Sequence, residues 1–326
     1  MCSRRIEGPA PLSKRSINGT VGPVSVSSAP TPGLSLQLGN FGATEVETVI
    51  ANAEAADRAG VDRVLVVDHV VMGSDTDVYR WGRFPTGPDE PWLEPLTLLA
   101  LLAGRTERVR LGTGVLVAAL RGGAVLAKTA ATLDLVSGGR LDLGVGTGWQ
   151  AREYEAAGLD HARRGPLLDE TLETVRRLWA QAPATIDRPG GAVPDVWCVP
   201  RSPHVPIWVS GTLSRPVLRR LVRWGDAWIP IMGISTERLA ADVVRLREAF
   251  TDAGRDPDTL RVQGALTVVR GDLDATLDGA AELLAAGATD LAFPSTALSR
   301  DPEEARALLA PLAAGFRERY VAAVVS

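Results

Sequence analysis

Asp68 and His69 are adjacent residues whose side chains are suited to acid–base chemistry. They follow residues 61–67, a run rich in β-branched side chains with few polar interruptions, which predicts a strand buried on both faces. An imidazole titrates near neutral pH, so it can stabilise charge or move a proton beside a reacting group. A structural alternative is that Asp68 caps the following segment while His69 packs beside it. Their place at a strand end favours function, and we take both as candidate catalytic residues.

Two glycine-rich segments predict places where the backbone approaches a ligand closely, because glycine carries no Cβ. The residues TGV at 113–115 interrupt a β-branched run at 109–117, and GVGTGW at 144–149 overlaps and follows a second run at 141–145. A glycine within a strand can also mark only a bulge. The second segment superficially resembles a dinucleotide-binding fingerprint, but it follows a third βαβ element rather than the first strand. We interpret it as a loop whose amides bind the chain or phosphate of a cofactor.

A third candidate for ligand binding is the SGT segment at 210–212, which lies between a predicted strand and a predicted helix. Free N–H groups at a helix start attract anions, so we predict that this segment binds a phosphate, with a plain N-cap as the alternative. Arg152 and Arg164 are candidates for further contacts with a phosphate or an acidic tail. The alternative for both arginines is an ion-paired or solvated face.

Predicted strands and helices alternate along the chain from residue 33 onward, which indicates a parallel sheet with crossover helices. Eight strands and eight helices predict a single (β/α)8 TIM barrel, with an open doubly wound sheet as the alternative. The predicted strands are 34–38, 61–67, 109–117, 141–145, 207–209, 227–231, 262–269 and 290–293. The predicted helices are 45–59, 96–106, 124–135, 166–180, 215–224, 236–253, 275–286 and 303–320.

Two insertions rich in proline and glycine, residues 71–93 and 181–205, are too long to be passive connectors. The active site of a TIM barrel lies at the carboxyl ends of its strands, and we expect both insertions to cover that face. Their aromatic residues would form a rim over the barrel mouth or, alternatively, a dimer interface. These residues are Trp81, Phe84, Trp92 and Trp197.

Composition argues against several classes of function. A formal net charge of −4 disfavours nucleic acid as the main partner. Two cysteines support no cysteine metal cluster, and three histidines without HxH or HExxH spacing argue against a catalytic metal. Apolar runs are too short for a transmembrane helix or a signal peptide. We therefore expect a cytoplasmic protein with no membrane partner, a disordered N-terminal arm at 1–32 and one barrel domain at 33–326.

Several segments together resemble the luciferase-like monooxygenase superfamily, in particular its deazaflavin-dependent oxidoreductases of actinobacterial type. The resemblance covers about residues 34–292, rests on the ordered set of motifs, and implies a TIM-barrel enzyme that is commonly a homodimer. The motifs are TLD at 132–134, SGGRL at 137–141, GVGTGW at 144–149, RG at 164–165 with DE at 169–170, PIWVSG at 206–211 and GDAW at 225–228.

The resemblance implies that the cofactor is the deazaflavin coenzyme F420, that Asp68 hydrogen-bonds its ring, and that His69 faces the reacting ring carbon. It also implies a bulge with a non-prolyl cis peptide near Gly114-Val115, behind the ring. Sugar-phosphate dehydrogenases that resemble this chain carry a glutamate in place of Trp149, which argues against oxidation of a sugar phosphate. The expected cofactor-binding residues are Asp68, Thr113, Gly114, Val115, Gly146, Gly148, Trp149, Arg152, Ser210, Gly211 and Thr212.

The function expected from the sequence is hydride transfer between coenzyme F420 and a small organic substrate. One alternative is an FMN-dependent two-component monooxygenase on the same fold. A second alternative is a non-catalytic protein that binds a flavin or deazaflavin. The Asp68-His69 pair and the intact glycine segments argue against this second alternative.

Overall fold

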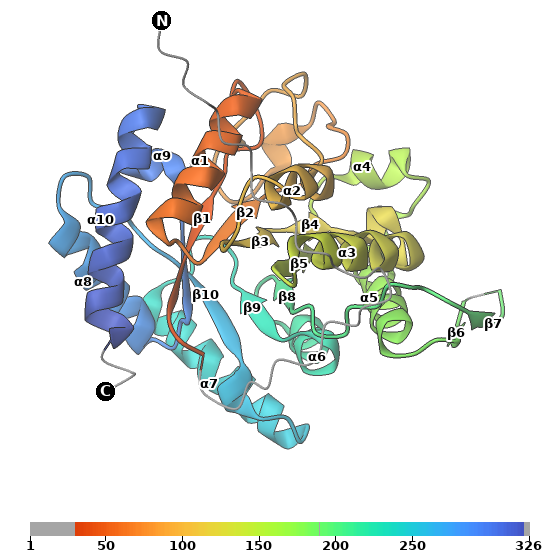
Figure 1. Cartoon of the computed structure of the whole chain (residues 1–326). Helices are drawn as coiled ribbons and strands as arrows, with labels where there is room; N and C mark the ends of the chain where they lie inside the picture. The colour runs from red at the N-terminus through yellow and green to blue at the C-terminus, as the bar shows by residue number, and fades with distance from the viewer. Residues whose placement is uncertain (1–29, 189, 323–326) are drawn as a thin grey trace, which may run out of the picture.

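Parallel strands form a closed barrel in the computed structural model of the chain, which describes residues 30–188 and 190–322 (Figure 1). The barrel strands are β1 (Gly33–Gln37), β2 (Arg63–Val66), β3 (Arg110–Thr113), β4 (Leu116–Val117), β5 (Leu141–Gly146), β8 (Ile207–Ser210), β9 (Ala227–Ile229), β10 (Arg261–Ala265) and β11 (Asp290–Pro294). The hydrogen-bonded order is β3-β2-β1-β11-β10-β9-β8-β5-β4, and a pairing between β3 and β5 closes the ring. Because neighbouring strands are parallel, all of them begin at one end of the barrel and finish at the other.

One long helix follows each of the eight strand positions within the described residues and covers the outside of the barrel (Figure 1). These helices are α1 (Val46–Ala59), α2 (Pro95–Ala103), α3 (Gly123–Ser137), α5 (Arg164–Ala180), α6 (Arg215–Trp224), α7 (Thr236–Asp252), α8 (Leu273–Ala285) and α10 (Pro302–Tyr320). In α5, buried Leu168, Leu172, Val175 and Trp179 recur every three or four residues and form the inward face. The predicted TIM barrel is confirmed.

Four predicted strands are shorter in the structure. The run at 61–67 corresponds to β2, which covers only Arg63–Val66. The run at 109–117 is divided into β3 and β4 by Gly114 and Val115. The run at 227–231 ends at Ile229, because Pro230 has no N–H to pair in a sheet. The run at 262–269 corresponds to β10, which ends at Ala265. These differences concern the ends of elements, and the order of strands and helices is as predicted.

The two insertions lie at opposite ends of the barrel. Residues 71–93 follow β2, contain the 3₁₀ helix η1 (Thr76–Val78), and include Trp92, which pairs with Phe41 beyond β1. Residues 181–205 connect the end of α5 to the start of β8 and form the hairpin of β6 (Ala184–Ile186) and β7 (Val193–Val196), seen at the edge of Figure 1. The prediction that both insertions cover the carboxyl ends is therefore wrong for 181–205, because a connection from helix to strand lies at the amino ends.

The predicted N-terminal arm falls almost entirely outside the described residues, since only residues 30–32 of it are described, where they lead into β1. Among the helices of the described chain, none combines the length and the apolar character that crossing a membrane requires.

Candidate active site at the carboxyl ends of the strands

His69 lies just beyond the end of β2, in a segment that the buried side chain of Asn40 holds in place. The Asn40 side chain accepts the N–H of Val67 and donates to the Val67 carbonyl, both at 2.9 Å. It also donates to the carbonyl of Leu93 at 3.1 Å. One amide side chain thus joins the end of β2 to the end of the first insertion and fixes the backbone that carries His69.

A buried carboxylate faces one edge of the His69 imidazole. Nδ1 of His69 lies 3.1 Å from Oε2 of Glu153, whose side chain is fully buried. Glu153 belongs to the short helix α4 (Ala151–Ala156), and its Oε1 accepts the N–H of Val70 at 2.8 Å. A carboxylate at Nδ1 favours the tautomer with its proton on that nitrogen and leaves Nε2 for a ligand. The sequence gives no signal for Glu153, because a glutamate in a short polar helix has the pattern of an exposed residue.

Aromatic side chains pack around the His69 imidazole. Phe84, Trp92 and Trp149 make edge contacts with the imidazole, at centroid distances of 5.4, 4.6 and 5.7 Å. Tyr79 packs against both Phe84 and Trp149. The first insertion therefore provides an aromatic cluster directly around His69, and only 9% of the His69 side chain is exposed. Of the other two residues of the predicted rim, Trp81 lies in the first insertion and contacts Tyr79. Trp197 lies in the second insertion, residues 181–205, and does not belong to this cluster.

Both carboxylate oxygens of Asp68 are held by protein groups. Oδ2 accepts the N–H of Val117 at 2.8 Å and Nη1 of Arg121 at 2.7 Å, and Oδ1 accepts Nη2 of Arg121 at 2.9 Å. Burial raises the pKa of Asp68, and the Arg121 guanidinium opposes this rise. Arg121 ends the 3₁₀ helix η2 (Ala118–Arg121), so the pair ties the end of β2 to the segment after β4. Asp68 thus positions the bulged strand, and its predicted hydrogen bond to a cofactor ring stays a prediction.

The strand position formed by β3 and β4 is bulged at Gly114-Val115, and the peptide bond between these residues is cis. The cis peptide predicted from the family resemblance is thus confirmed. Oγ1 of Thr113 donates to the carbonyl of Gly144 at 2.6 Å, which joins the bulge to β5. Val115 packs against the buried cluster formed by Trp208, Ala227 and Ile229.

The glycines of the 144–149 segment make room for this bulge. A Cβ on Gly144 would overlap the carbonyl oxygen of Thr113, and a Cβ on Gly146 would lie 2.8 Å from the Val115 side chain. Gly148 has a φ of 66°, a backbone conformation that residues with a Cβ rarely adopt. Packing against the bulge therefore requires Gly144 and Gly146, in addition to any role in binding a ligand.

The segment at 210–212 leads from the end of β8 into α6. Ser214 is the N-cap residue of α6, and its side chain makes no capping hydrogen bond. Apart from Pro216, which has no N–H, the first turn of α6 therefore keeps N–H groups that can bind an anion. Arg152, by contrast, forms an exposed ion pair with Glu155 at 2.5 Å.

The structure brings most of the predicted site residues together at adjacent strand ends. An added Cβ on Gly146 would lie within 4 Å of both Val115 and Ser210, and an added Cβ on Gly148 would lie 3.0 Å from Val117, which contacts Asp68. Trp149 contacts His69. Thr212 and Arg152 are exposed at the edge of this surface.

The chain thus folds as a (β/α)8 barrel with a bulged third strand position and a histidine just beyond the carboxyl end of β2. The chain belongs to the luciferase-like monooxygenase family, whose model matches residues 31–323. An uncharacterized protein of Mycobacterium tuberculosis is 30% identical over 280 residues, which are 82% of this chain and 93% of that protein. A phthiodiolone/phenolphthiodiolone dimycocerosates ketoreductase of Mycobacterium kansasii is 33% identical over 213 residues, which are 64% of this chain but only 58% of the ketoreductase.

Solved structures with this fold include proteins with different cofactors. An F420-dependent secondary alcohol dehydrogenase in complex with an F420-acetone adduct has a TM-score of 0.71 and 16% identity, over 88% of this chain and 99% of that one. A riboflavin lyase with modified FMN has a TM-score of 0.60 and 20% identity, over 78% of this chain and 67% of that one. At these identities the likeness shows a shared fold, and it leaves the choice of cofactor open.

Proposed function

We propose that this protein transfers a hydride between coenzyme F420 and an apolar carbonyl compound or the corresponding alcohol. The observation that carries the proposal is the His69 imidazole, which Glu153 faces at Nδ1 and which aromatic rings enclose at the strand ends. A ketoreductase among the relatives and a secondary alcohol dehydrogenase among the structures of this fold support the same type of reaction.

The strand ends offer what a flat cofactor with a phosphate-bearing chain requires. A Cβ on Gly114 would make only ordinary contacts, at 3.6 Å from Leu65, so packing within the protein does not by itself require a glycine here. The uncapped first turn of α6 is suited to the phosphate. When bound there, coenzyme F420 would supply or accept the hydride, while the chain provides orientation and proton transfer.

His69 is placed to handle the proton that accompanies the hydride. In the reducing direction, Nε2 of His69 would donate a proton to the carbonyl oxygen of the substrate as negative charge develops there. In the oxidising direction, Nε2 would take the proton of the substrate hydroxyl. The Glu153 carboxylate lies 3.1 Å from Nδ1, where it would orient the ring so that Nε2 faces the substrate.

The aromatic cluster indicates that the substrate is apolar. Tyr79, Phe84, Trp92 and Trp149 present ring faces and edges around His69. Burial of apolar area against such rings contributes about 25 cal/mol per Å² to binding. A sugar phosphate would instead lose hydration without a matching charge in this cluster.

Binding of the two cofactors distinguishes the proposal from its alternatives. Titration of the protein should quench tryptophan fluorescence with coenzyme F420 at a dissociation constant about tenfold or more below that for FMN, because Trp92 and Trp149 adjoin His69. Tighter binding of FMN would instead favour a two-component monooxygenase. Failure of both to bind would contradict every function proposed for these strand ends.

The Gly114→Ala variant should bind the cofactor about tenfold or more weakly, while its melting temperature stays close to that of the wild type. The added Cβ finds only ordinary contacts within the protein, but it would stand between the bulge and a cofactor ring. Gly144→Ala is the matched comparison, because its Cβ overlaps the Thr113 carbonyl and should destabilise the fold. Unchanged cofactor affinity in Gly114→Ala would place the ring elsewhere.

A further inference from the structure

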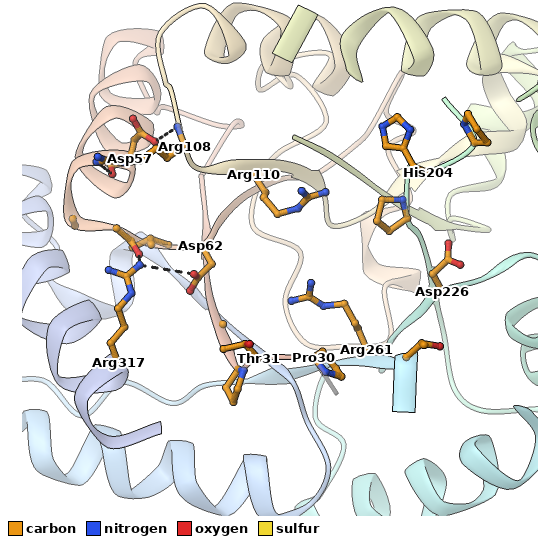
Figure 2. A pocket seen from close by; sticks show the side chains of 18 of the residues that line it. Pro30, Thr31, Asp57, Asp62, Arg108, Arg110, His204, Asp226, Arg261 and Arg317 are labelled. Atoms are coloured by element: carbon orange, nitrogen blue, oxygen red, sulfur yellow. Dashed lines mark hydrogen bonds and ion pairs between the residues drawn. The ribbon is translucent and has the colours of Figure 1, made fainter. Parts of the chain in front are cut away.

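A cavity of about 1080 Å³ opens at the amino ends of the strands, at the end of the barrel opposite to His69 (Figure 2). Its wall includes residues that begin or immediately precede barrel strands, such as Gly33, Asp62 and Pro206. Ligand pockets for small molecules commonly occupy about 300–1,000 Å³. The cavity therefore has the size of a site for a small organic molecule.

Cationic side chains dominate the wall of this cavity. Seven arginines line it, against three aspartates. The arginines are Arg58, Arg108, Arg110, Arg176, Arg255, Arg261 and Arg317, and the aspartates are Asp57, Asp62 and Asp226. The protein as a whole carries a formal net charge of −4, so this concentration of positive charge is local.

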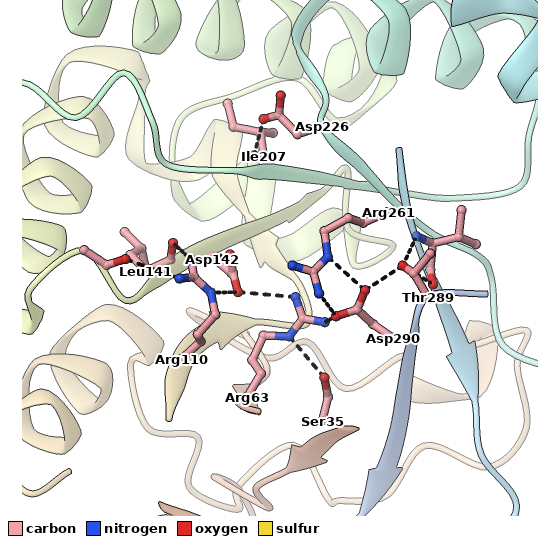
Figure 3. A network of polar contacts seen from close by, with 12 residues as sticks. Ser35, Arg63, Arg110, Leu141, Asp142, Ile207, Asp226, Arg261, Thr289 and Asp290 are labelled. Atoms are coloured by element: carbon pink, nitrogen blue, oxygen red, sulfur yellow. Dashed lines mark hydrogen bonds and ion pairs between the residues drawn. The ribbon is translucent and has the colours of Figure 1, made fainter. Parts of the chain in front are cut away.

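Two guanidinium groups, those of Arg110 at the start of β3 and Arg261 at the start of β10, extend into the cavity (Figure 2). Each is held from one side by a buried aspartate: Arg110 by Asp142, with contacts of 2.8 Å, and Arg261 by Asp290, with contacts of 2.6 and 3.0 Å (Figure 3). Burial lowers the pKa of Arg261, Asp290 raises it, and the net result is a rise. The positive charge of Arg110 acts against this rise, because the two guanidinium groups repel each other.

The layer behind these two arginines does not balance their charge. Arg63 lies in the same network and contacts both Asp142 and Asp290, at 3.4 and 2.9 Å (Figure 3). Three guanidinium groups thus share two carboxylates, which leaves one positive charge uncompensated within the network. Among the described residues, none accepts a hydrogen bond from Nη1 of Arg261, and Nη1 of Arg110 makes only a 3.3 Å bond to the Gly139 carbonyl.

We propose that this cavity is a binding site for a small organic polyphosphate, a molecule with two or more linked phosphate groups. Guanidinium groups bind phosphate oxygens in paired hydrogen bonds, and phosphates carry enough charge to neutralise several arginines at once. Residues 1–29 are an unsuitable occupant, because they contain four cationic side chains and a single glutamate.

The polyphosphate site is separate from the proposed cofactor site. The buried cluster of Trp208, Ala227 and Ile229 lies between them, since Val115 of the bulge packs against this cluster and the Arg63 guanidinium stacks on the Trp208 ring at 3.9 Å. A ligand in the cavity therefore does not compete with a cofactor at the carboxyl ends of the strands.

Calorimetric titration with tripolyphosphate tests the site, in protein already saturated with whichever of coenzyme F420 or FMN binds it. We expect saturable binding to the wild type, and a dissociation constant about tenfold or more higher in Arg261→Gln. Arg58→Glu, at the rim and 69% exposed, should weaken binding about threefold or more and leaves the buried network intact. Arg219→Glu is the control, since Arg219 is exposed on α6 outside the cavity, and it should bind as the wild type does.

Several outcomes would overturn the proposal. They are absence of saturable binding to the wild type, equal affinity in the wild type and Arg58→Glu, and loss of affinity in Arg219→Glu as large as in Arg58→Glu. Should Arg261→Gln fail to fold, the comparison of tripolyphosphate affinity between the wild type and Arg58→Glu alone decides whether the site exists. Tighter binding of citrate than of tripolyphosphate would assign the cavity to polycarboxylates and contradict the phosphate assignment. If no cofactor binds, the same variants are compared without it, so failure of the proposed function leaves this test intact.

Discussion

Replacing His69 with alanine should lower substrate turnover about 10²–10⁴-fold, the usual contribution of a positioned proton-transfer group. The affinity for the cofactor should change little, because the glycine bulge and the first turn of α6 are separate from the imidazole. Turnover is measured as the change in F420 absorbance with a panel of apolar secondary alcohols and ketones, and affinity as fluorescence quenching. This pair of measurements separates loss of chemistry from loss of binding.

Two further variants complete the test of His69. Glu153→Gln keeps the shape of the side chain but removes the charge beside Nδ1, so turnover should fall about tenfold or more while cofactor affinity is retained. His204→Ala is the control, because His204 lies at the amino ends of the strands beside Asp134, and its activity should match the wild type. Near-full turnover in His69→Ala would make the histidine a packing residue and remove the central group of the mechanism.

The largest effect on stability is expected from Asp142→Asn, at about 3–5 kcal/mol. Asp142 is 3% exposed and accepts hydrogen bonds from Arg63 and Arg110 (Figure 3). Without its charge, three buried or half-buried guanidinium groups share the single carboxylate of Asp290. Asp258→Asn is the matched control: Asp258 is 65% exposed and pairs with Arg247, so its loss should cost less than about 1 kcal/mol. Urea unfolding at pH 7 measures both, and similar losses would contradict the role of the buried network.

The same carboxylate predicts a dependence of stability on pH. Burial alone would raise the pKa of Asp142, but the charges and hydrogen bonds of Arg110, followed by Arg63 and Arg261, lower it from 3.8 to about 2. The ionised form is therefore favoured in the folded protein, and its contribution is fully present above about pH 4. It should be lost as the pH falls from about 4 to about 2, at a cost of about 2 kcal/mol. Asp142→Asn should lack this part of the acid dependence, and an unchanged acid profile in the variant would contradict the assignment.

The sequence by itself determined the barrel and the place of the candidate active site. Each of the eight barrel strand positions and the eight helices outside them has a local signal, such as β-branched runs or apolar residues at helical spacing, and these signals survive without knowledge of distant contacts. The alternation of the two then leaves few arrangements open, because parallel neighbours need crossover connections. Polar residues and glycines after strands consequently predicted that Asp68, His69 and the 144–149 segment would meet at one end.

Only the tertiary structure decided which distant side chains meet at that end. Glu153 contacts the segment of His69 across 83 positions of sequence, and Arg121 contacts Asp68 across 53. Local periodicity assigns such charged residues to solvent, because it contains no information on which opposite charge barrel closure brings to them. The same holds for Arg63, Asp142 and Asp290, which are buried at the amino ends of the strands. The placement of residues 181–205 was likewise decided by the direction of the connection from α5 to β8, and their composition alone does not specify it.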